Sequence, residues 1–197
     1  MIRLALAALV GLALTAAAAA GESPAVSAAP KSLGDAAAPV TIIEYASLSC
    51  PHCAAFHTER LPWLKETFID TGRARLEFRD FPLNGPALWG AMLAHCAGEE
   101  RYFAYLELLF ARQDRWAFGD QVLPGLQRIA QQAGMSGADF EACMADQPLQ
   151  EQVIKSRAEG IEQYEIDSTP SFVIDGEVFG GVPSEADLTE RIEAAGG

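Results

Sequence analysis

Residues 40–53 read VTIIEYASLSCPHC, and this stretch decides the fold. Its first six residues form a nearly continuous apolar run rich in β-branched side chains and broken by one charge, Glu44, a pattern typical of a buried central strand. A short turn follows, and after the CPHC motif apolar side chains recur at helical spacing, at Phe56, Leu61, Leu64 and Phe68. The sequence therefore predicts two cysteines, three positions apart, at the point where a buried strand is followed by a helix.

The segments that follow extend this unit. Residues 51–70 are expected to form one helix, kinked at Pro62 because proline lacks the N–H that a helix interior needs. Residues 74–81 (ARLEFRDF) alternate as a strand does, which completes a β-α-β unit. The pattern is then helical throughout residues 85–167, which predicts an inserted helical subdomain.

The C-terminal part returns to strands. Residues 171–174 and 177–179 flank Asp175-Gly176, a dipeptide typical of a tight hairpin turn. Residues 184–195 are expected to form the last helix, with Ser184 as its N-cap. The order β-α-β, helical insertion, β-β-α predicts an α/β protein with a thioredoxin-like fold and an inserted helical subdomain.

The N-terminus carries the one long apolar run of the sequence. Residues 4–20 follow Arg3 and end in small residues of the A-x-A type, so residues 1–20 are predicted to be a cleaved signal peptide. A retained membrane anchor is the alternative, but the run decays into alanines without a charged or aromatic stop. Residues 21–38 are small and polar and predict a flexible lead-in, which leaves residues 39–197 for the folded domain.

Composition limits the class of partner. The 197 residues are 50% hydrophobic and 21% charged, enough apolar material for one compact domain, which we expect to be a monomer. With 14 basic and 27 acidic residues the formal net charge is -13, which argues against nucleic acid as a partner. Export would place the chain in the periplasm, an oxidising compartment in which disulfides persist.

The CPHC motif has the features of a redox-active cysteine pair. Cys50 stands at the start of a helix, where free N–H groups and the helix dipole stabilise a thiolate, so it is the better nucleophile. Pro51 suits the first helical turn, and His52 can stabilise the thiolate further. Cys53, one turn into the helix, suits the resolving role, in which it attacks the mixed disulfide formed through Cys50.

Other readings of the motif remain open. The pair could be a structural disulfide, or with His57 could form part of a zinc site, because Cys50, Cys53 and His57 share one helix face. No second C-x-x-C is present, and Ala54 after Cys53 does not fit the haem-attachment motif C-x-x-C-H. We therefore expect no metal and no cofactor, and we expect His57 to be a partly buried polar group near the motif.

Two further positions point to the same site. Thr169-Pro170 directly precedes the hairpin, where a cis bond would present its backbone to an extended substrate; the alternative is a trans proline that begins an edge strand. Glu44 lies in the buried strand, where an acid is costly unless it tunes ionisation or relays protons. The alternative is a carboxylate that reaches solvent at the strand end.

The remaining cysteines, Cys96 and Cys143, lie on apolar helix faces of the insertion. We expect them to form a structural disulfide, with two buried free thiols as the alternative. Trp63, Trp89 and Trp116 are expected to be core or groove-lining residues.

Four segments together resemble one known family. GDAAAPVTIIEYASLSCPHCAAFH, FRDFPL, AHCAG and TPSFVIDGEVFGG, within residues 33–195, are similar to the DsbA family of periplasmic thiol:disulfide oxidoreductases, in the branch common among alphaproteobacteria. The resemblance implies that Cys50 is the nucleophile and Cys53 its resolving partner. It also implies that Thr169-Pro170 is a cis-proline loop and that Glu44 is a buried acid, and some relatives carry an acid at the position of His57.

The leading hypothesis is a periplasmic enzyme that introduces disulfides into exported proteins. It would accept electrons from reduced, unfolded polypeptides at Cys50–Cys53 and be reoxidised by a quinone-linked membrane partner similar to DsbB. A disulfide reductase or isomerase is the second hypothesis. The third is a non-catalytic module, either a metal carrier that uses Cys50, Cys53 and His57 or a peptide-binding protein.

Overall fold

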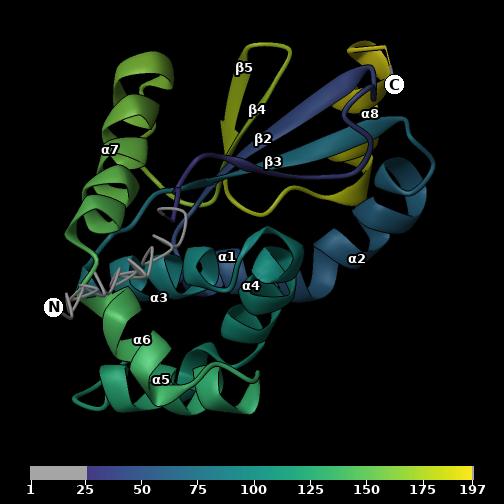
Figure 1. Cartoon of the computed structure of the whole chain (residues 1–197). Coiled ribbons are helices and arrows are strands. Elements are labelled where there is room, and N and C mark those ends of the chain that lie inside the picture. The colour runs from purple at the N-terminus through teal and green to yellow at the C-terminus, as the bar shows by residue number, and fades with distance from the viewer. Residues whose placement is uncertain (1–25, 197) are drawn as a thin grey trace, which may run out of the picture.

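The computed structural model describes residues 26–196, so the signal peptide predicted for residues 1–20 lies outside the described residues. A five-stranded sheet in the order β1-β3-β2-β4-β5 forms the centre (Figure 1). Strands β2 and β3 are parallel, and each of the other neighbouring pairs is antiparallel. The strands are β1 (Lys31–Leu33), β2 (Val40–Ala46), β3 (Ala74–Asp80), β4 (Ser171–Ile174) and β5 (Glu177–Gly180).

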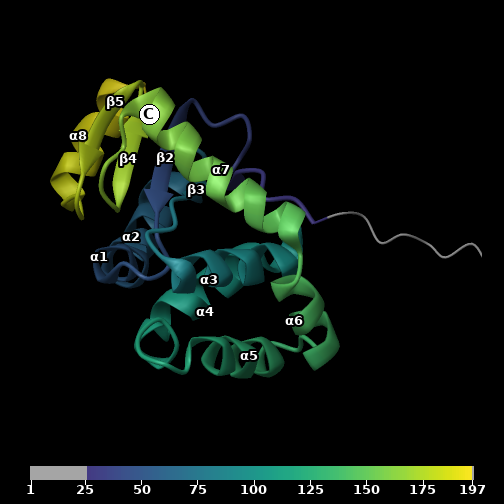
Figure 2. The same cartoon turned by 90° about the vertical axis from the view of Figure 1, so that its left-hand side faces the viewer.

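Helices surround the sheet and extend below it as a second layer (Figures 1 and 2). The α-helices are α1 (Pro51–Ala55), α2 (Leu61–Leu64), α3 (Gly85–Cys96), α4 (Tyr102–Ala111), α5 (Val122–Gln132), α6 (Gly137–Met144), α7 (Gln147–Tyr164) and α8 (Glu185–Ala194). Two π-helical segments, η1 (Phe56–Arg60) and η2 (Lys65–Ile69), alternate with α1 and α2. Two 3-10 turns, η3 (Glu99–Arg101) and η4 (Gln113–Arg115), lie in the insertion.

The helix after the CPHC motif is continuous in sequence but irregular in its hydrogen bonding. The N–H of Leu61 bonds to the carbonyl of Phe56, five residues back, which is the π-helical pattern. Pro62 then stands in the first turn of α2, where its missing N–H costs little. The kink predicted at Pro62 is therefore seen as a π-helical turn directly before this residue.

The two faces of the sheet pack against different helices. Ile42 and Leu76 belong to a core with residues of the α1–η2 helix and α8, on one face. On the other face Tyr45 packs against α7, and a Cβ placed on Gly160 would lie 2.6 Å from the Tyr45 ring. Glycine at this position therefore lets α7 approach the sheet closely.

The segment before residue 39 differs from the expectation. Residues 31–33, assigned from sequence to a flexible lead-in, form β1 and pair antiparallel with β3. Ala28 is buried, and its N–H donates to the side chain of Gln152 on α7. The segment pairs with the edge strand β3, which lies more than forty positions later in the sequence. The short, polar segment itself therefore carries no signal for a strand.

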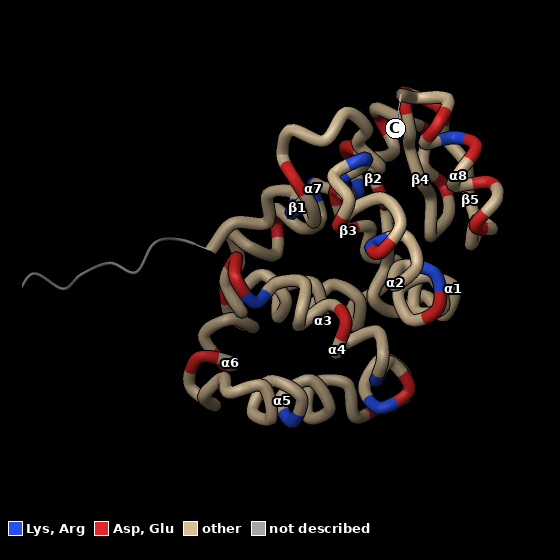
Figure 3. The backbone as a smooth tube through the Cα atoms, turned by 90° about the vertical axis from the view of Figure 1, so that its right-hand side faces the viewer, with Lys and Arg blue, Asp and Glu red and all other residues tan. Residues whose placement is uncertain are grey.

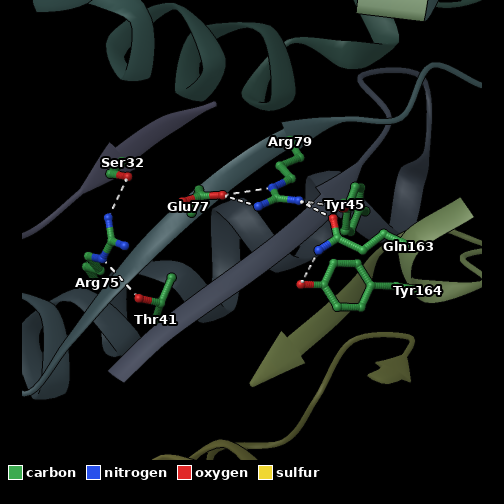
Figure 4. A network of polar contacts seen from close by, with 8 residues as sticks. All are labelled: Ser32, Thr41, Tyr45, Arg75, Glu77, Arg79, Gln163 and Tyr164. Atoms are coloured by element: carbon green, nitrogen blue, oxygen red, sulfur yellow. Dashed lines mark hydrogen bonds and ion pairs between the residues drawn. The ribbon is translucent and has the colours of Figure 1, made fainter. Parts of the chain in front are cut away.

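Polar side chains tie the strands together across the outer face of the sheet (Figure 4). Arg79 of β3 donates to Glu77 and to the hydroxyl of Tyr45 on β2, and Arg75 donates to the hydroxyl of Thr41. Acidic and basic positions are scattered over the sheet layer and the insertion alike (Figure 3).

Helices α3 to α7 occupy residues 85–164, within the segment 85–167 for which the sequence predicts an inserted helical subdomain. Trp116 is buried there and its indole N–H donates to the carbonyl of Leu109, while Trp63 and Trp89 are partly buried. A disulfide between Cys96 and Cys143, with an S–S distance of 2.07 Å, joins α3 to α6, as expected. None of the helices within residues 26–196 has the length and apolar character needed to cross a membrane.

The disulfide should stabilise the protein without taking part in its chemistry. It closes a loop of 47 residues, which in the chain-entropy model is worth about 4 kcal/mol. The double variant Cys96→Ala/Cys143→Ala should lower the free energy of unfolding by up to this amount in urea titrations. Unchanged stability would show that the bridge does not constrain the unfolded chain.

Candidate active site

The candidate site lies at the junction between the end of β2 and the start of α1. Cys50 is the N-cap residue of α1 with an extended backbone, and its N–H bonds to the carbonyl of Ser47 at 3.0 Å. Pro51 follows in the first turn, as predicted, and the His52 side chain is exposed. Both cysteines are thiols in this structure, Cys50 7% exposed and Cys53 fully buried.

The surroundings of Cys50 favour its thiolate. A hydrogen bond from the Cys53 thiol is the largest cause that lowers the Cys50 pKa; burial opposes it, and the Thr169 side chain acts in the same direction as Cys53. The backbone N–H groups of Cys53 and His52, which are free at a helix start, contribute further. Together they lower the pKa of Cys50 to about 5.

Cys53 has the opposite character. Burial is the largest cause that raises its pKa, and the hydrogen bond to Cys50 and the negative charge of Glu44 raise it further. Cys53 therefore stays a thiol under conditions in which Cys50 is a thiolate. The motif combines one reactive sulfur with one protected sulfur.

The Thr169-Pro170 loop lies against Cys50. The bond between these two residues is cis, as predicted. The Cys50 thiol, when protonated, donates to the carbonyl of Thr169 at 3.3 Å. Pro170 is buried and its carbonyl accepts from the N–H of Gly181 at 2.9 Å, which holds the loop to the end of β5. The fold thus brings residues 119 positions apart to one site.

Glu44 is fully buried, between β3 and β4, and does not reach solvent. Its carboxylate contacts His57, whose Nε2 lies 3.1 Å from each of the two oxygens. From the sequence His57 is expected to be a partly buried polar group near the motif, with a zinc ligand as the alternative, and the structure buries its side chain almost completely. The ring is instead turned towards Glu44, and residues 26–196 contain no group of three or more His, Cys, Asp or Glu side chains placed to share a metal ion.

Gln113 is a residue of the site that the sequence analysis missed. Its side-chain amide donates to the carbonyls of Leu48 and Cys50, at 2.9 and 3.0 Å, so it braces the turn that carries Cys50. No signal in the sequence marks it, because it stands in a polar stretch between Arg112 and Asp114.

The comparisons agree with this arrangement. The family model described as Thioredoxin matches residues 27–194. The crystal structure of Wolbachia pipientis alpha-DsbA1 is 34% identical, covers 84% of this chain and 90% of its own, and superposes with a TM-score of 0.78. The chain belongs to the thioredoxin family, in its DsbA branch. The predicted thioredoxin-like fold and the resemblance to DsbA proteins are therefore confirmed.

Other DsbA-like and related proteins match as well. A protein-disulfide isomerase from Novosphingobium aromaticivorans is 25% identical, with a TM-score of 0.72 over 84% of this chain and 96% of that one. A Rickettsia typhi protein with the provisional name protein-disulfide oxidoreductase is 30% identical over 145 residues, which are 73% of this chain and 54% of that protein. The chain thus spans about half the length of the curated relatives it matches.

The difference between the two thiols can be measured directly. Because the pKa of Cys50 is lowered to about 5, its rate of alkylation should rise through a midpoint near that pH. Cys53 should react only after unfolding, since burial raises its pKa. Mass spectrometry after alkylation at several pH values locates the label, and modification of Cys53 before Cys50 would contradict this assignment.

The brace from Gln113 predicts a stability effect. In Gln113→Leu the carbonyls of Leu48 and Cys50 lose their donor, which should cost about 1–3 kcal/mol in the free energy of unfolding. Gln131→Leu is the matched control, because Gln131 is exposed on α5. Equal effects of the two substitutions in urea titrations would argue against the brace.

Proposed function

We propose that this protein is a thiol:disulfide oxidoreductase that introduces disulfides into other polypeptides. The observation that carries the proposal is the lowered pKa of Cys50 at the start of α1, beside the protected thiol of Cys53. A stabilised thiolate favours the reduced form of the pair, and this makes the corresponding disulfide a stronger oxidant.

The exchange would take place in two steps. A substrate thiolate attacks Cys50 Sγ in the Cys50–Cys53 disulfide, and Cys53 leaves with the electron pair of the broken bond and takes up a proton. A second substrate thiolate attacks the substrate sulfur of the mixed disulfide and releases Cys50 as its stabilised thiolate. The substrate gains a disulfide, and two electrons pass to the enzyme.

The Thr169-Pro170 loop is proposed to hold the substrate during this exchange. The Thr169 carbonyl lies within hydrogen-bond distance of Cys50 Sγ, so backbone bound to this loop would lie beside the reacting sulfur. An extended peptide could pair with the loop as an added strand, which would recognise backbone rather than particular side chains. Such recognition suits reduced, unfolded polypeptides of many sequences.

Compartment and redox partner are part of the same proposal. We infer export to the periplasm from the apolar run in residues 4–20, and the disulfide between Cys96 and Cys143 suits an oxidising compartment. An oxidase must be reoxidised after each turnover. A quinone-linked membrane protein similar to DsbB is the proposed electron acceptor.

A reductase or isomerase is the second candidate. It is supported by the name of the Novosphingobium aromaticivorans relative, a protein-disulfide isomerase at 25% identity. Such a protein would have to be kept reduced in the cell, and it would use the same Cys50 thiolate to attack a substrate disulfide.

Substitution of each cysteine separates the two roles. Cys50→Ser should abolish disulfide exchange with a model peptide, because the stabilised thiolate is lost. Cys53→Ser should instead accumulate a mixed disulfide when treated with a disulfide-bonded peptide, because nothing resolves it. Non-reducing electrophoresis and mass spectrometry detect the adduct. Equal residual turnover in the two variants would contradict the dithiol mechanism.

A further inference from the structure

Two histidines among the described residues are buried against carboxylates. His57 Nε2 lies 3.1 Å from both oxygens of Glu44, and His95 Nε2 lies 2.7 Å from Oδ2 of Asp80. All four side chains are almost completely buried. The first pair lies near Cys53, because His57 follows Cys53 by four residues, about one turn, in the same continuous helix, and the charge of Glu44 acts on the Cys53 thiol.

The hydrogen bonds of His57 assign its protonation. Its Nδ1 is buried without a hydrogen-bond partner within residues 26–196. A protonated, charged ring would leave an N–H unpaired at this nitrogen, whereas a neutral ring leaves only a lone pair there. The arrangement therefore favours a neutral imidazole whose Nε2–H donates to an ionised Glu44.

Aromatic rings fix the orientation of this imidazole. The Phe110 ring of α4 stacks on it with a centroid distance of 4.2 Å and an interplanar angle of 26°. Phe56 and Phe78 contact it in edge-on geometry, at 5.6 and 5.7 Å. The helix, the sheet and the insertion each contribute one ring, so the imidazole cannot turn away from Glu44 without repacking of the core.

We propose that His57 is a positioning residue that holds the Glu44 carboxylate ready to take the proton of Cys53. The inference rests on the proposed function. When Cys50 is joined to another sulfur in a mixed disulfide, Cys53 gives its proton to Glu44 and its thiolate attacks Cys50 Sγ. The bond between Cys50 and the other sulfur breaks, and that sulfur leaves with the electron pair as a thiolate.

The single N–H of His57 is suited to this task. Because it lies equally far from both oxygens, it contacts the carboxyl group before and after the proton arrives. The pair changes from one negative charge to none during the transfer, so no isolated positive charge has to form in the core. A purely structural role would require only a contact, and the Asp80–His95 pair provides a comparison for that case.

A single-turnover reaction separates the two steps. Reduced protein is mixed with an aromatic disulfide that releases one coloured thiolate when Cys50 attacks it and a second when Cys53 resolves the mixed disulfide. The first release depends on reagent concentration and the second does not. In His57→Gln we expect the first rate to stay within about twofold and the second to fall roughly tenfold or more, since a well-placed general base is lost.

Three further variants control the test. His95→Gln removes the other buried pair and should leave both rates close to wild type. Glu44→Gln should slow the second release as well, and combining it with His57→Gln should add little, because the two residues act as a unit. Phe110→Leu keeps both Glu44 and His57 but removes the ring that stacks on His57. It should slow the second release alone, and it serves as the test if His57→Gln unfolds more readily.

The outcomes distinguish the inference from the function on which it rests. Three results would overturn the inference when wild-type protein releases both thiolates. His57→Gln could release them at the wild-type rates, or it could slow both steps equally. The third result is that the effects of His57→Gln and Glu44→Gln on the second rate multiply. Release of only the first thiolate by wild-type protein would contradict the proposed function itself. Selective slowing of the second release in His57→Gln, with His95→Gln unaffected, supports the positioning role.

Discussion

The Cys53 thiol and the first N–H groups of α1 stabilise the thiolate of Cys50, and its pKa is lowered to about 5. A helix start supplies such N–H groups only if the strand before it delivers the chain at the right place and angle. The buried β2, the Ser47 turn and Pro51 satisfy this condition. Because the bonds stabilise the reduced form, they also determine how strongly the oxidised pair would draw electrons from other thiols.

The helical insertion supports this site although it contributes neither cysteine. Gln113 braces the carbonyls of Leu48 and Cys50 from the turn after α4, and Phe110 stacks on the ring of His57. The disulfide between α3 and α6 constrains the subdomain that presents these two residues. The insertion thus fixes the position of the reactive turn on one side and the geometry of the buried acid on the other.

Local patterns in the sequence were sufficient for the strand, the CPHC helix start and the hairpin, because periodicity and turn chemistry act over a few residues. They were sufficient also for Cys96–Cys143 and for the cis bond at Pro170, once export and family resemblance were considered. They failed where a contact is long-range. β1 forms because it can pair with the edge strand β3. Gln113 donates to carbonyls more than sixty positions away in the sequence. The bond between Glu44 and His57 joins a strand and a helix, and the sequence does not specify that these two side chains face each other.

The central claim is that stabilisation of the Cys50 thiolate makes the Cys50–Cys53 disulfide oxidising, and a redox titration of this pair tests it most directly. The protein is equilibrated with mixtures of reduced and oxidised glutathione at neutral pH, and the fraction of reduced pair is measured by alkylation and mass spectrometry. The account predicts a potential more oxidising than about -200 mV, well above the value of about -270 mV typical of thioredoxin. A potential near that of thioredoxin would contradict the account and favour a reductase.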